Sequence, residues 1–551
     1  MGSTNVKSHA RALKPKVLIV GSGPIGATYA RKLVDAGIDV LMIEMGAQER
    51  PIPGDHKKNS VQVQKDLDNF IKVVQGGLEL LSVPVDKVPG PNLEPTSWST
   101  RKNIRNGQNP LQDAYDNLPV AAATRTVGGM GSHWTCCTPE QHPTLERSDL
   151  FTPAQWASLY AEAKSLVKTN NTSFDASIRQ QLVLKVLQAA HEGQGRGFQA
   201  LPLACERREE GNTDYVEWSC AATVLGKIAT GEEGKGKGLF ELRSSWQCVE
   251  LLREDVTGRV WGALVKDLLA DEYVLVEAER YVVCAAAVLT PGILFNSGFR
   301  AEEGSLPALG HYLTEQIMTF CQVVLKRSLV ESVKDDPWHL GWDKIVKEHE
   351  QKWPEDPLPF PFNDPDPQVW MPVTEARPWH AQIHRDAFSY GQTPADIDQR
   401  TVVDFRFYSA VQPIYSNYVD FSEKIRDGYS MPQPTFHYQV PDEDAERAHL
   451  MMKDMVDVAS NLGGWLPGAE PRYLPPGSAL HICGTTRAGR DVKDSVVNSE
   501  SRVWGHDNLF LGGCNVIPTP SASNPTLSAM CFAIVGANAI AKDLTEGHDG
   551  A

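Results

Sequence analysis

The stretch KVLIVGSGPIG, residues 16–26, decides the fold of this chain. Its first half is a continuous apolar run, which is typical of a strand buried on both faces of a parallel sheet. Its second half has the pattern G-x-G-x-x-G, and apolar residues at helical spacing follow over 27–36. Gly37 ends that helix, and residues 39–43 predict a second buried strand that ends at Glu44. The stretch therefore predicts a strand–helix–strand unit of an α/β fold with a parallel sheet.

The three glycines of this turn predict a dinucleotide site. Gly21 permits the tight turn, Gly23 lets the backbone approach a pyrophosphate, and Gly26 allows the helix to pack closely on the strand. The helix N-terminus then faces the negative charge of the ligand. Glu44 follows the first glycine by 23 residues, the place of a carboxylate that binds ribose hydroxyls. The motif alone does not separate FAD from NAD.

Composition excludes several classes of protein. The chain has 551 residues, of which 41% are hydrophobic and 22% charged, so it has no compositional reason to stay unfolded. Its 53 basic and 69 acidic residues leave a formal charge of −16, which repels nucleic acid and anionic membranes. The apolar runs at 281–289 and 530–541 are shorter than the ~20 residues that cross a bilayer. We expect neither a nucleic-acid nor a membrane partner.

The N-terminus and the cysteines bear on the compartment. Residues 1–20 contain no apolar segment before the first strand, so they do not predict a classical secretion signal. The 10 cysteines show neither the density of a disulfide scaffold nor a C-x-x-C metal spacing, so reduced thiols and no metal are expected. These observations predict an intracellular, cytoplasmic protein, with non-classical release as the alternative. The triplet His56-Lys57-Lys58 is interpreted as solvated surface.

The first unit finds its sheet partners far along the chain. Strands are expected at 239–250, 259–267, 272–279, 280–284 and 509–512, and a helix is expected to begin at Pro291. Residues 354–378 contain eight prolines and are interpreted as an extended surface excursion outside the core. One cofactor would therefore be bound by segments that lie hundreds of residues apart in the sequence, and this suits a long dinucleotide such as FAD.

Six segments together carry a resemblance to a known family: the N-terminal motif, 126–136, 284–298, 384–391, 481–489 and 508–526. With them, nearly the whole chain resembles the glucose-methanol-choline (GMC) family of flavin oxidoreductases, and within it the members that oxidise pyranose sugars. The resemblance implies a Rossmann-like FAD-binding domain of the GMC type and a second α+β substrate-binding domain. It also implies a homotetramer, with an arm at 97–110 as a candidate contact.

The domain boundaries follow from this resemblance. The FAD-binding domain is expected to be assembled from three separate segments. A mainly helical segment and the substrate-binding domain, which holds the excursion at 354–378 and a substrate loop at 384–391, would lie between them. In chain order these parts are 12–150 (FAD), 151–235 (helical, contributing to the substrate domain), 236–312 (FAD), 313–475 (substrate) and 476–545 (FAD, with the catalytic residues).

The resemblance assigns cofactor contacts outside the first motif. His133 stands where the family's sugar oxidases carry a histidine bonded covalently to the flavin. From residue type and its glycine-rich surroundings alone, a structural buried histidine would be the better interpretation. The remaining cofactor residues are the two loop glycines, a threonine near the flavin edge, a backbone contact to adenine, a small residue at the strand-to-helix turn and the C-terminal Asn-Pro-Thr: Gly128, Gly129, Thr135, Val249, Ala285, Asn524, Pro525 and Thr526.

The expected chemistry requires a base beside the electron acceptor. Oxidising a secondary alcohol removes a proton from oxygen and a hydride from carbon, and histidine is suited to the first task because its unperturbed pKa is about 6.5. A single histidine in an unknown protein is more often structural. His481 nevertheless matches the family's catalytic base, and Asn524 its partner, an amide that hydrogen-bonds the developing alkoxide.

The segment at 384–391 resembles the family's mobile substrate loop. A sugar needs carboxylate, guanidinium and amide groups together with an aromatic wall. Asp386, Arg406 and Gln382 would supply the polar groups, and Phe388 and Tyr390 the wall. Composition alone fits an ordinary polar loop equally well. Departures from the pattern of the sugar oxidases just after His481 weaken any claim about sugar preference.

The predicted function is FAD-dependent oxidation of an aldopyranose such as glucose at C2, with dioxygen or a quinone as the acceptor and hydrogen peroxide as the product from dioxygen. Two alternatives within the family are a glycoside 3-oxidase and a sugar dehydrogenase. An alternative of another class is a GMC-type lyase that keeps FAD structurally. A non-enzymatic FAD-binding protein is disfavoured because both His481 and Asn524 are present.

Overall fold

The N-terminal strand, turn and helix form as the sequence predicts. In the computed structural model, β2 (Val17–Val20) is buried throughout, α2 (Pro24–Asp35) follows the glycine turn, and β3 (Val40–Ile43) lies beside β2 in parallel register. The structure describes residues 12–64, 66–84, 107–208, 215–232, 237–254, 257–302, 305–385, 393–394 and 396–546. The predicted substrate-loop residues Asp386, Phe388 and Tyr390, and most of the predicted arm at 97–110, lie outside these ranges.

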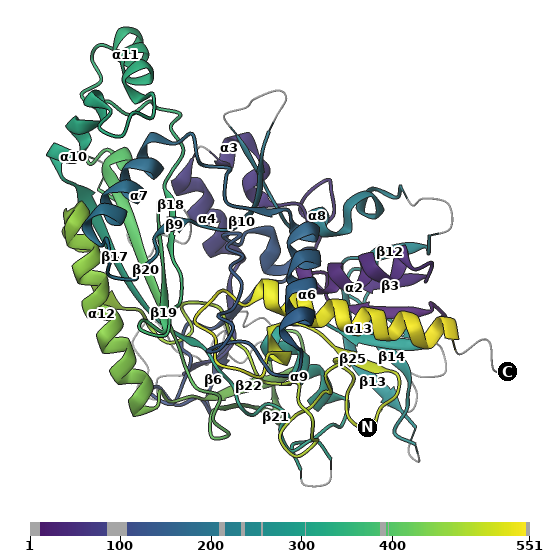
Figure 1. The fold of residues 1–551 in the computed structure, drawn as a ribbon. Helices are drawn as coiled ribbons and strands as arrows, with labels where there is room; N and C mark the ends of the chain where they lie inside the picture. The colour runs from purple at the N-terminus through teal and green to yellow at the C-terminus, as the bar shows by residue number, and fades with distance from the viewer. Residues whose placement is uncertain are drawn as a thin grey trace, which may run out of the picture.

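A five-stranded parallel sheet is built from distant parts of the chain (Figure 1). Each of its four pairings is parallel. Its order is β12 (Phe240–Arg243), β3, β2, β16 (Arg280–Val283) and β25 (Leu509–Leu511). Of the strands expected at 239–250, 280–284 and 509–512, the last two join the N-terminal unit in this sheet. The first divides between β12 of this sheet and a strand beginning at Trp246 in another sheet. The inner strands β3 and β2 of the parallel sheet are wholly apolar and buried, because layers of the protein cover both faces, whereas the edge strand β12 (Phe-Glu-Leu-Arg) is only partly buried.

Helices and a second sheet flank the parallel sheet. Helix α2 packs on β2 and β3, and α13 (Thr526–Glu546) packs on α2 and α6 (Pro153–Val167). The described helices include one, α13, that is long and apolar enough to cross a membrane, and 61% of its most apolar window is buried inside the protein. That burial is typical of a core helix. The flanking sheet has the order β1 (Ala12–Leu13), β15 (Glu272–Val276), β14 (Val260–Asp267) and β13 (Trp246–Arg253).

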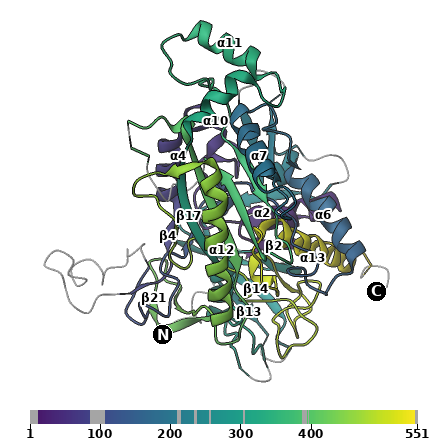
Figure 2. The same cartoon turned by 60° about the vertical axis from the view of Figure 1, so that its left-hand side comes forward.

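A largely antiparallel seven-stranded sheet forms the second body of the molecule. Its order is β23 (Gly463–Trp465), β17 (Gln316–Leu325), β20 (Val402–Ala410), β19 (Trp379–His384), β18 (Gln368–Met371) and β9 (Gln199–Ala200), and β24 (Arg472–Tyr473) also pairs with β17. Helix α12 (Asp442–Leu462) packs on β17 and β20 and stands in front of them in Figure 2. Every residue of β20 is buried, so this sheet is covered on both faces.

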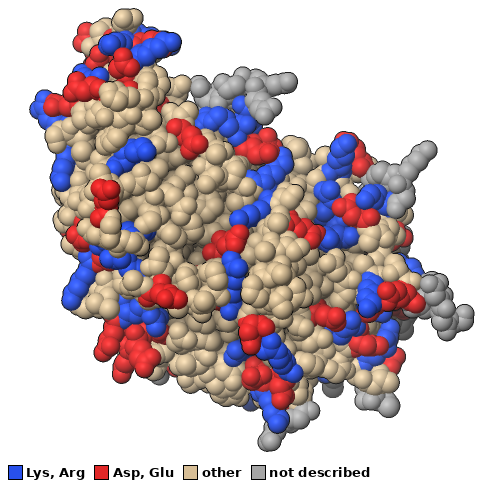
Figure 3. Space-filling view, in the orientation of Figure 1, with Lys and Arg blue, Asp and Glu red and all other residues tan. Residues whose placement is uncertain are grey.

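The remaining elements connect these bodies. They include the hairpin β21 (Tyr418–Arg426) and β22 (Pro432–His437) and the antiparallel pair β10 (Leu203–Arg207) and β11 (Val216–Trp218). The other helices are α3 (Val61–Gln64), α4 (Leu67–Gly77), α7 (Ile178–Ala190), α8 (Ala221–Leu225), α9 (Ala286–Asn296), α10 (Arg327–Ser332) and α11 (Trp342–Lys352). Figure 3 shows basic and acidic side chains interspersed on the visible face, without a large patch of either sign.

The helix expected to begin at Pro291 begins five residues earlier, and Pro291 lies inside α9. A proline there has no N–H for the carbonyl of Ala287, four residues before it. The hydroxyl of Thr485 donates to that carbonyl instead, over 2.5 Å. The prediction failed because a distant side chain supplies the hydrogen bond that the proline removes.

One segment interpreted as surface is buried, and the proline-rich excursion is buried in part. Residues 368–371 of the proline-rich excursion form β18, whose Val369 and Met371 have no exposed surface. In the charged triplet His56 is fully buried, and Lys57 and Lys58 are 9% and 6% exposed. Lys57 pairs with Glu49 at 2.8 Å, and the ammonium of Lys58 lies 4.5 Å from the centre of the Trp218 ring. These partners, all outside the triplet, make burial of the charges tolerable.

Candidate active site

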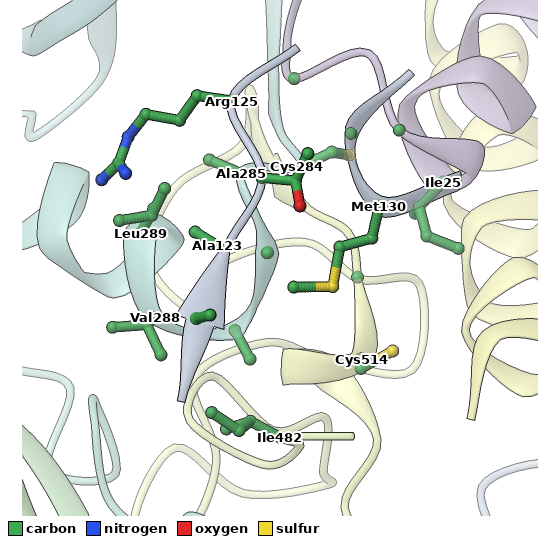
Figure 4. Close-up of a pocket in the computed structure, with 18 of the residues that line it drawn as sticks. Ile25, Ala123, Arg125, Met130, Cys284, Ala285, Val288, Leu289, Ile482 and Cys514 are labelled. Carbon is green, nitrogen blue, oxygen red and sulfur yellow. The ribbon is translucent and has the colours of Figure 1, made fainter. Parts of the chain in front are cut away.

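A single cavity joins the first glycine turn to the predicted catalytic pair. It begins at the carboxyl ends of β2 and β3, passes between the two glycine-rich loops, and reaches His481 and Asn524. Figure 4 shows part of its wall, where Met130, Cys284, Ala285, Ile482 and Cys514 project around the open space. Small and apolar residues dominate the lining, so backbone can approach a large flat ligand closely.

The three glycines of the first turn are needed for three different reasons. Gly21 has φ of +101°, and a Cβ there would lie 2.4 Å from the carbonyl oxygen of Cys284. A Cβ at Gly26 would lie 2.1 Å from the carbonyl oxygen of Gly21, so a side chain there would push the helix off the turn. A Cβ at Gly23 would meet its nearest atom at 3.9 Å. The space over Gly23 is therefore open toward the cavity, as a pyrophosphate requires.

Glu44 lies at the end of β3 and lines the same cavity. Its Oε2 accepts hydrogen bonds from the backbone N–H of Ser22 at 3.1 Å and from the Ser22 hydroxyl at 2.8 Å. Its Oε1 accepts from the N–H of Gly46 at 2.9 Å. Burial raises the pKa of this carboxyl, and the three donors oppose that effect. The remaining lone pairs can accept from ribose hydroxyls.

The second glycine-rich loop closes over the first. The N–H of Gly128 donates to the hydroxyl of Ser22 at 2.9 Å, which ties the two loops together. Gly128 has φ of +96°, and a Cβ there would meet the Cα of Gly54 at 2.9 Å. Gly129 also has positive φ, +53°, and faces Gly23. This packing admits only backbone at the contact and leaves the cavity side of the loops clear.

His133 follows this loop and lines the cavity. Its Nε2 lies 2.8 Å from the hydroxyl of Thr124, and the ring is 1% exposed. Burial, together with the positive charge of nearby Lys57, lowers the pKa of His133 to about 4. The imidazole is therefore neutral and nucleophilic at physiological pH. The buried Lys57, interpreted from sequence as surface, is thus part of the surroundings of this histidine.

The structure brings the two predicted catalytic residues together. His481 and Asn524 are 43 residues apart in sequence, and the Asn524 amide nitrogen lies 3.2 Å from Nε2 of His481. Both side chains line the cavity. Burial lowers the pKa of His481 to about 3, so the ring is uncharged at neutral pH and able to accept a proton.

Two of the five predicted substrate residues, Gln382 and Arg406, lie in the part of the chain that the structure describes. Gln382 is brought to the site, because its amide nitrogen donates to Oδ1 of Asn524 at 2.6 Å. Arg406 stands opposite Gln382 in the register of β19 and β20, is 1% exposed, and lies 3.9 Å from the carboxylate of Asp404. Asp386, Phe388 and Tyr390 lie outside the described residues.

Four of the other predicted cofactor residues line the cavity, and Val249 does not. Thr135, Ala285, Pro525 and Thr526 line it, and the last of these begins α13, whose N-terminal end favours negative charge in the cavity. Val249 lies on β13, where its carbonyl accepts from the side chain of Asn296 at 2.7 Å. The residues of that strand that line the cavity are Trp246, Gln247 and Cys248.

Sequence reasoning did not find several residues that support the site. Glu315, directly before β17, and Gln316, its first residue, contact His481, and Cys137 donates its thiol to the Gln382 side chain at 3.4 Å. No local motif marks Glu315 and Gln316, because they reach the site only when the seven-stranded sheet docks on the cofactor cavity. Cys137 belongs to no catalytic or metal-binding motif, so the sequence alone does not indicate its contact with Gln382.

The arrangement fits FAD on structural grounds. The open space over Gly23 suits a pyrophosphate, the Glu44 carboxylate suits a ribose, and the same cavity extends to the imidazole–amide pair. A dinucleotide bound across this span would place its reactive ring toward His481 and Asn524. The fold and the site together define a flavin-dependent oxidoreductase of the glucose-methanol-choline class.

Comparison with known proteins agrees with this class. Residues 413–533 match the family model described as GMC oxidoreductase, and residues 14–61 match the model described as FAD binding domain. A solved structure of formate oxidase from Aspergillus oryzae RIB40 superposes with a TM-score of 0.65, covering 98% of this chain and 100% of its own, at 13% identity, and so shares the fold.

Full-length relatives specify the family further. Pyranose 2-oxidase of Emericella nidulans is 45% identical over 97% of this chain and 94% of its own length. C-glycoside 3-oxidase of Microbacterium trichothecenolyticum is 31% identical over 96% of this chain and 97% of its own. The chain belongs to the pyranose 2-oxidase family of GMC oxidoreductases.

Proposed function

We propose that this protein is an FAD-dependent oxidase that converts aldopyranoses such as D-glucose to 2-keto sugars. Dioxygen, which becomes hydrogen peroxide, or a quinone is the electron acceptor. The bound FAD supplies the redox chemistry, accepting two electrons and the carbon-bound hydrogen of the alcohol. The observation that carries the proposal is the 3.2 Å contact between Asn524 and Nε2 of His481, in the cavity that begins at the dinucleotide turn.

The chain's own residues handle the proton and the developing charge. The neutral His481 accepts the hydroxyl proton of the sugar at Nε2, and Asn524 donates a hydrogen bond from Nδ2 to the alkoxide oxygen that develops. Because both groups line the cavity and face each other, one hydroxyl group can contact both of them. Gln382 holds the Asn524 amide in place.

The test is the absorption spectrum of the protein before and after glucose is added without air. Bleaching of the flavin is expected, and a 2-keto product should appear in NMR spectra after turnover in air. A flavin that bleaches with neither glucose nor a glucoside would refute the oxidase and the related dehydrogenase alike, and would favour a lyase with structural FAD.

A glycoside 3-oxidase is the second candidate, favoured by the full-length match to a C-glycoside 3-oxidase. The higher identity to pyranose 2-oxidase favours C2. Comparing the products formed from glucose and from a C-glucoside by NMR distinguishes the two, because oxidation at C3 of the glycoside with no C2 oxidation of glucose would reverse the assignment.

The covalent flavin bond is assigned to His133. Supporting this, the side chain faces the cavity and is neutral. His133→Ala should release the flavin into the supernatant on acid precipitation, whereas the parent protein should give a yellow pellet. A yellow pellet from the variant would show that the bond is formed elsewhere.

The remaining assignments concern the sugar and the assembly. Asp386, Arg406, Phe388 and Tyr390 are assigned to sugar selection with Gln382, and Asp386→Ala should change the relative rates with different sugars. The protein is assigned as a homotetramer with the segment 97–110 at a contact. The neighbouring Leu111 and Tyr115 are 59% and 95% exposed, which favours an interface there. Light scattering coupled to size exclusion measures the oligomeric state.

A further inference from the structure

A buried glutamine lies on the side of His481 that faces away from Asn524. Gln316 is the first residue of β17 and is 4% exposed. Its Oε1 lies 2.7 Å from Nδ1 of His481. Its amide nitrogen lies 2.9 Å from the carbonyl oxygen of Ser521 and 3.0 Å from that of Ser523. The segment 521–523 therefore anchors the glutamine, and the glutamine contacts the catalytic ring.

The two carbonyl groups determine which way the amide points. A backbone carbonyl oxygen only accepts hydrogen bonds, so the NH₂ group of Gln316 must face Ser521 and Ser523. The amide oxygen then faces His481, and it too can only accept. The Nδ1 atom of His481 must therefore carry a proton. Because a neutral imidazole has a single N–H, its Nε2 carries the lone pair.

Contacts on the opposite side of the ring are compatible with this tautomer. Oε1 of Gln382 lies 3.4 Å from the Cys137 thiol, which also lies 3.8 Å from the carbonyl oxygen of Thr135, and the NH₂ group of Gln382 faces Oδ1 of Asn524 at 2.6 Å. That contact turns the NH₂ group of Asn524 toward Nε2 of His481, at 3.2 Å. An N–H at Nε2 would oppose this donor. The two backbone carbonyls behind Gln316 therefore select the tautomer protonated at Nδ1, and the Asn524 side accommodates it.

We propose that Gln316 is a positioning residue that fixes the tautomer of His481, so that Nε2 is unprotonated and faces the substrate hydroxyl as the base. The role rests on the proposed oxidase function. The other tautomer would direct an N–H at the hydroxyl and could not accept its proton. Enzymes that lose the group holding a base histidine in the correct tautomer can slow by as much as ~10⁴-fold.

Glu315 has a separate role that a test must not confuse with this one. Its Oε1 accepts from the backbone N–H of His481 at 2.5 Å, and its other oxygen accepts from the backbone N–H of Gln316. It therefore holds the backbone at this position, whereas Gln316 holds the ring. Among the described residues, two more titratable side chains lie near the ring. His380 has its pKa lowered by burial and by His481 to about 3, and the ring of Tyr408 lies 5.9 Å from that of His481, centre to centre.

The first measurement is the nitrogen NMR spectrum of the resting holoenzyme, labelled with ¹⁵N-histidine and compared with the His481→Gln variant to assign the ring. We expect a protonated Nδ1 and an unprotonated Nε2 at His481 in the parent protein. In Gln316→Met, which has similar volume and no hydrogen-bonding group, the two nitrogens should show mixed protonation. A proton found on Nε2 in the parent protein overturns the proposal, even if the variant does not fold.

The second measurement is anaerobic flavin reduction by glucose in a rapid-mixing instrument. Gln316→Met should reduce the limiting rate at least about tenfold, while the glucose dissociation constant changes less than twofold. The matched control is Gln180→Met, another buried glutamine, which lies on α7 away from the cavity. Equal rates for the two variants would overturn the role of Gln316.

A third variant, Gln316→Glu, adds a readout that a packing role would not produce. A carboxylate beside the Nδ1 proton would favour the imidazolium, so the loss of reduction rate at acidic pH should begin at a higher pH than in the parent protein. An unchanged pH profile in a folded variant would contradict the proposal. If no pyranose reduces the parent flavin, the proposed oxidase fails, and the NMR result still decides whether Gln316 fixes the tautomer.

Discussion

Replacement of Asn524 by Ala is the most direct test of the imidazole–amide pair. The substitution removes the donor that lies 3.2 Å from Nε2 of His481 and the acceptor that lies 2.6 Å from the amide of Gln382. The first loss takes away the hydrogen bond to the developing alkoxide, and the second frees Gln382 to rotate. The cavity and the base remain in place, so sugar should still bind.

The expected magnitude follows from the first loss. Removing one preorganised donor to a developing oxyanion costs about 3–4 kcal/mol, or roughly 10²- to 10³-fold in rate. The rate of flavin reduction at saturating glucose should fall by that factor in anaerobic rapid mixing, with a much smaller change in glucose affinity. The isosteric Asn524→Asp variant should be at least as slow, because its carboxylate repels an alkoxide and favours the protonated His481.

The matched control is Asn417→Ala. Asn417 is also buried, and its side chain bridges to Gln439 through the carbonyl oxygen and the N–H of that residue, at 2.9 Å and 3.1 Å. This variant should lose some stability and keep its reduction rate. If Asn524→Ala reduces its flavin within about twofold of the parent rate, the stabilisation of developing charge does not come from this amide, and the assignment is refuted.

Three other changes have defined outcomes. The flavin reduction rate should stay flat between pH 5 and 8, because a pKa of about 3 keeps His481 neutral in that range. Protonation of His481 can lower the rate only as the pH falls toward 3. A loss of rate centred near pH 6.5 would contradict this prediction. Thr485→Val should lower the free energy of unfolding by about 1–3 kcal/mol, since it leaves a buried helix carbonyl without a donor, whereas the exposed Thr545→Val should change it little in the same denaturation assay. Lys57→Met should raise the pKa of His133, because it removes a nearby positive charge. Covalent attachment of FAD to the apoprotein, measured by acid precipitation, should therefore slow at pH 5 to 6 and recover at pH 8. Unchanged attachment at both pH values would argue against the influence of the lysine.

The parallel sheet could be predicted because its information is local. An apolar strand followed by three glycines at defined spacing leaves little freedom, since Gly21 and Gly26 lie where a Cβ would collide with backbone. The strands near 280 and 510 are short, mostly apolar runs typical of strands buried in a parallel sheet, and they join the N-terminal unit as predicted. The strand expected at 239–250 instead divides between two sheets, and its first part, β12, is a partly buried edge strand.

The errors share one physical cause. Pro291 was expected to begin a helix, the triplet at 56–58 to be solvated, and residues 368–371 to lie outside the core. Each expectation was sound for an isolated segment. The hydroxyl of Thr485, the carboxylate of Glu49 and the neighbouring strands β9 and β19 changed the outcome by supplying partners from elsewhere in the chain.

The sequence by itself determined the dinucleotide turn, the parallel α/β sheet and the residue types that an alcohol oxidase needs, because backbone sterics and hydrophobic periodicity act between near neighbours. Only the tertiary structure decided the geometry of the site. It brought Nε2 of His481 to the amide of Asn524 and placed Gln316 on the other side of the ring. The protonated nitrogen of an imidazole is selected by the groups that surround it, and here those groups come from separate segments that meet only after folding.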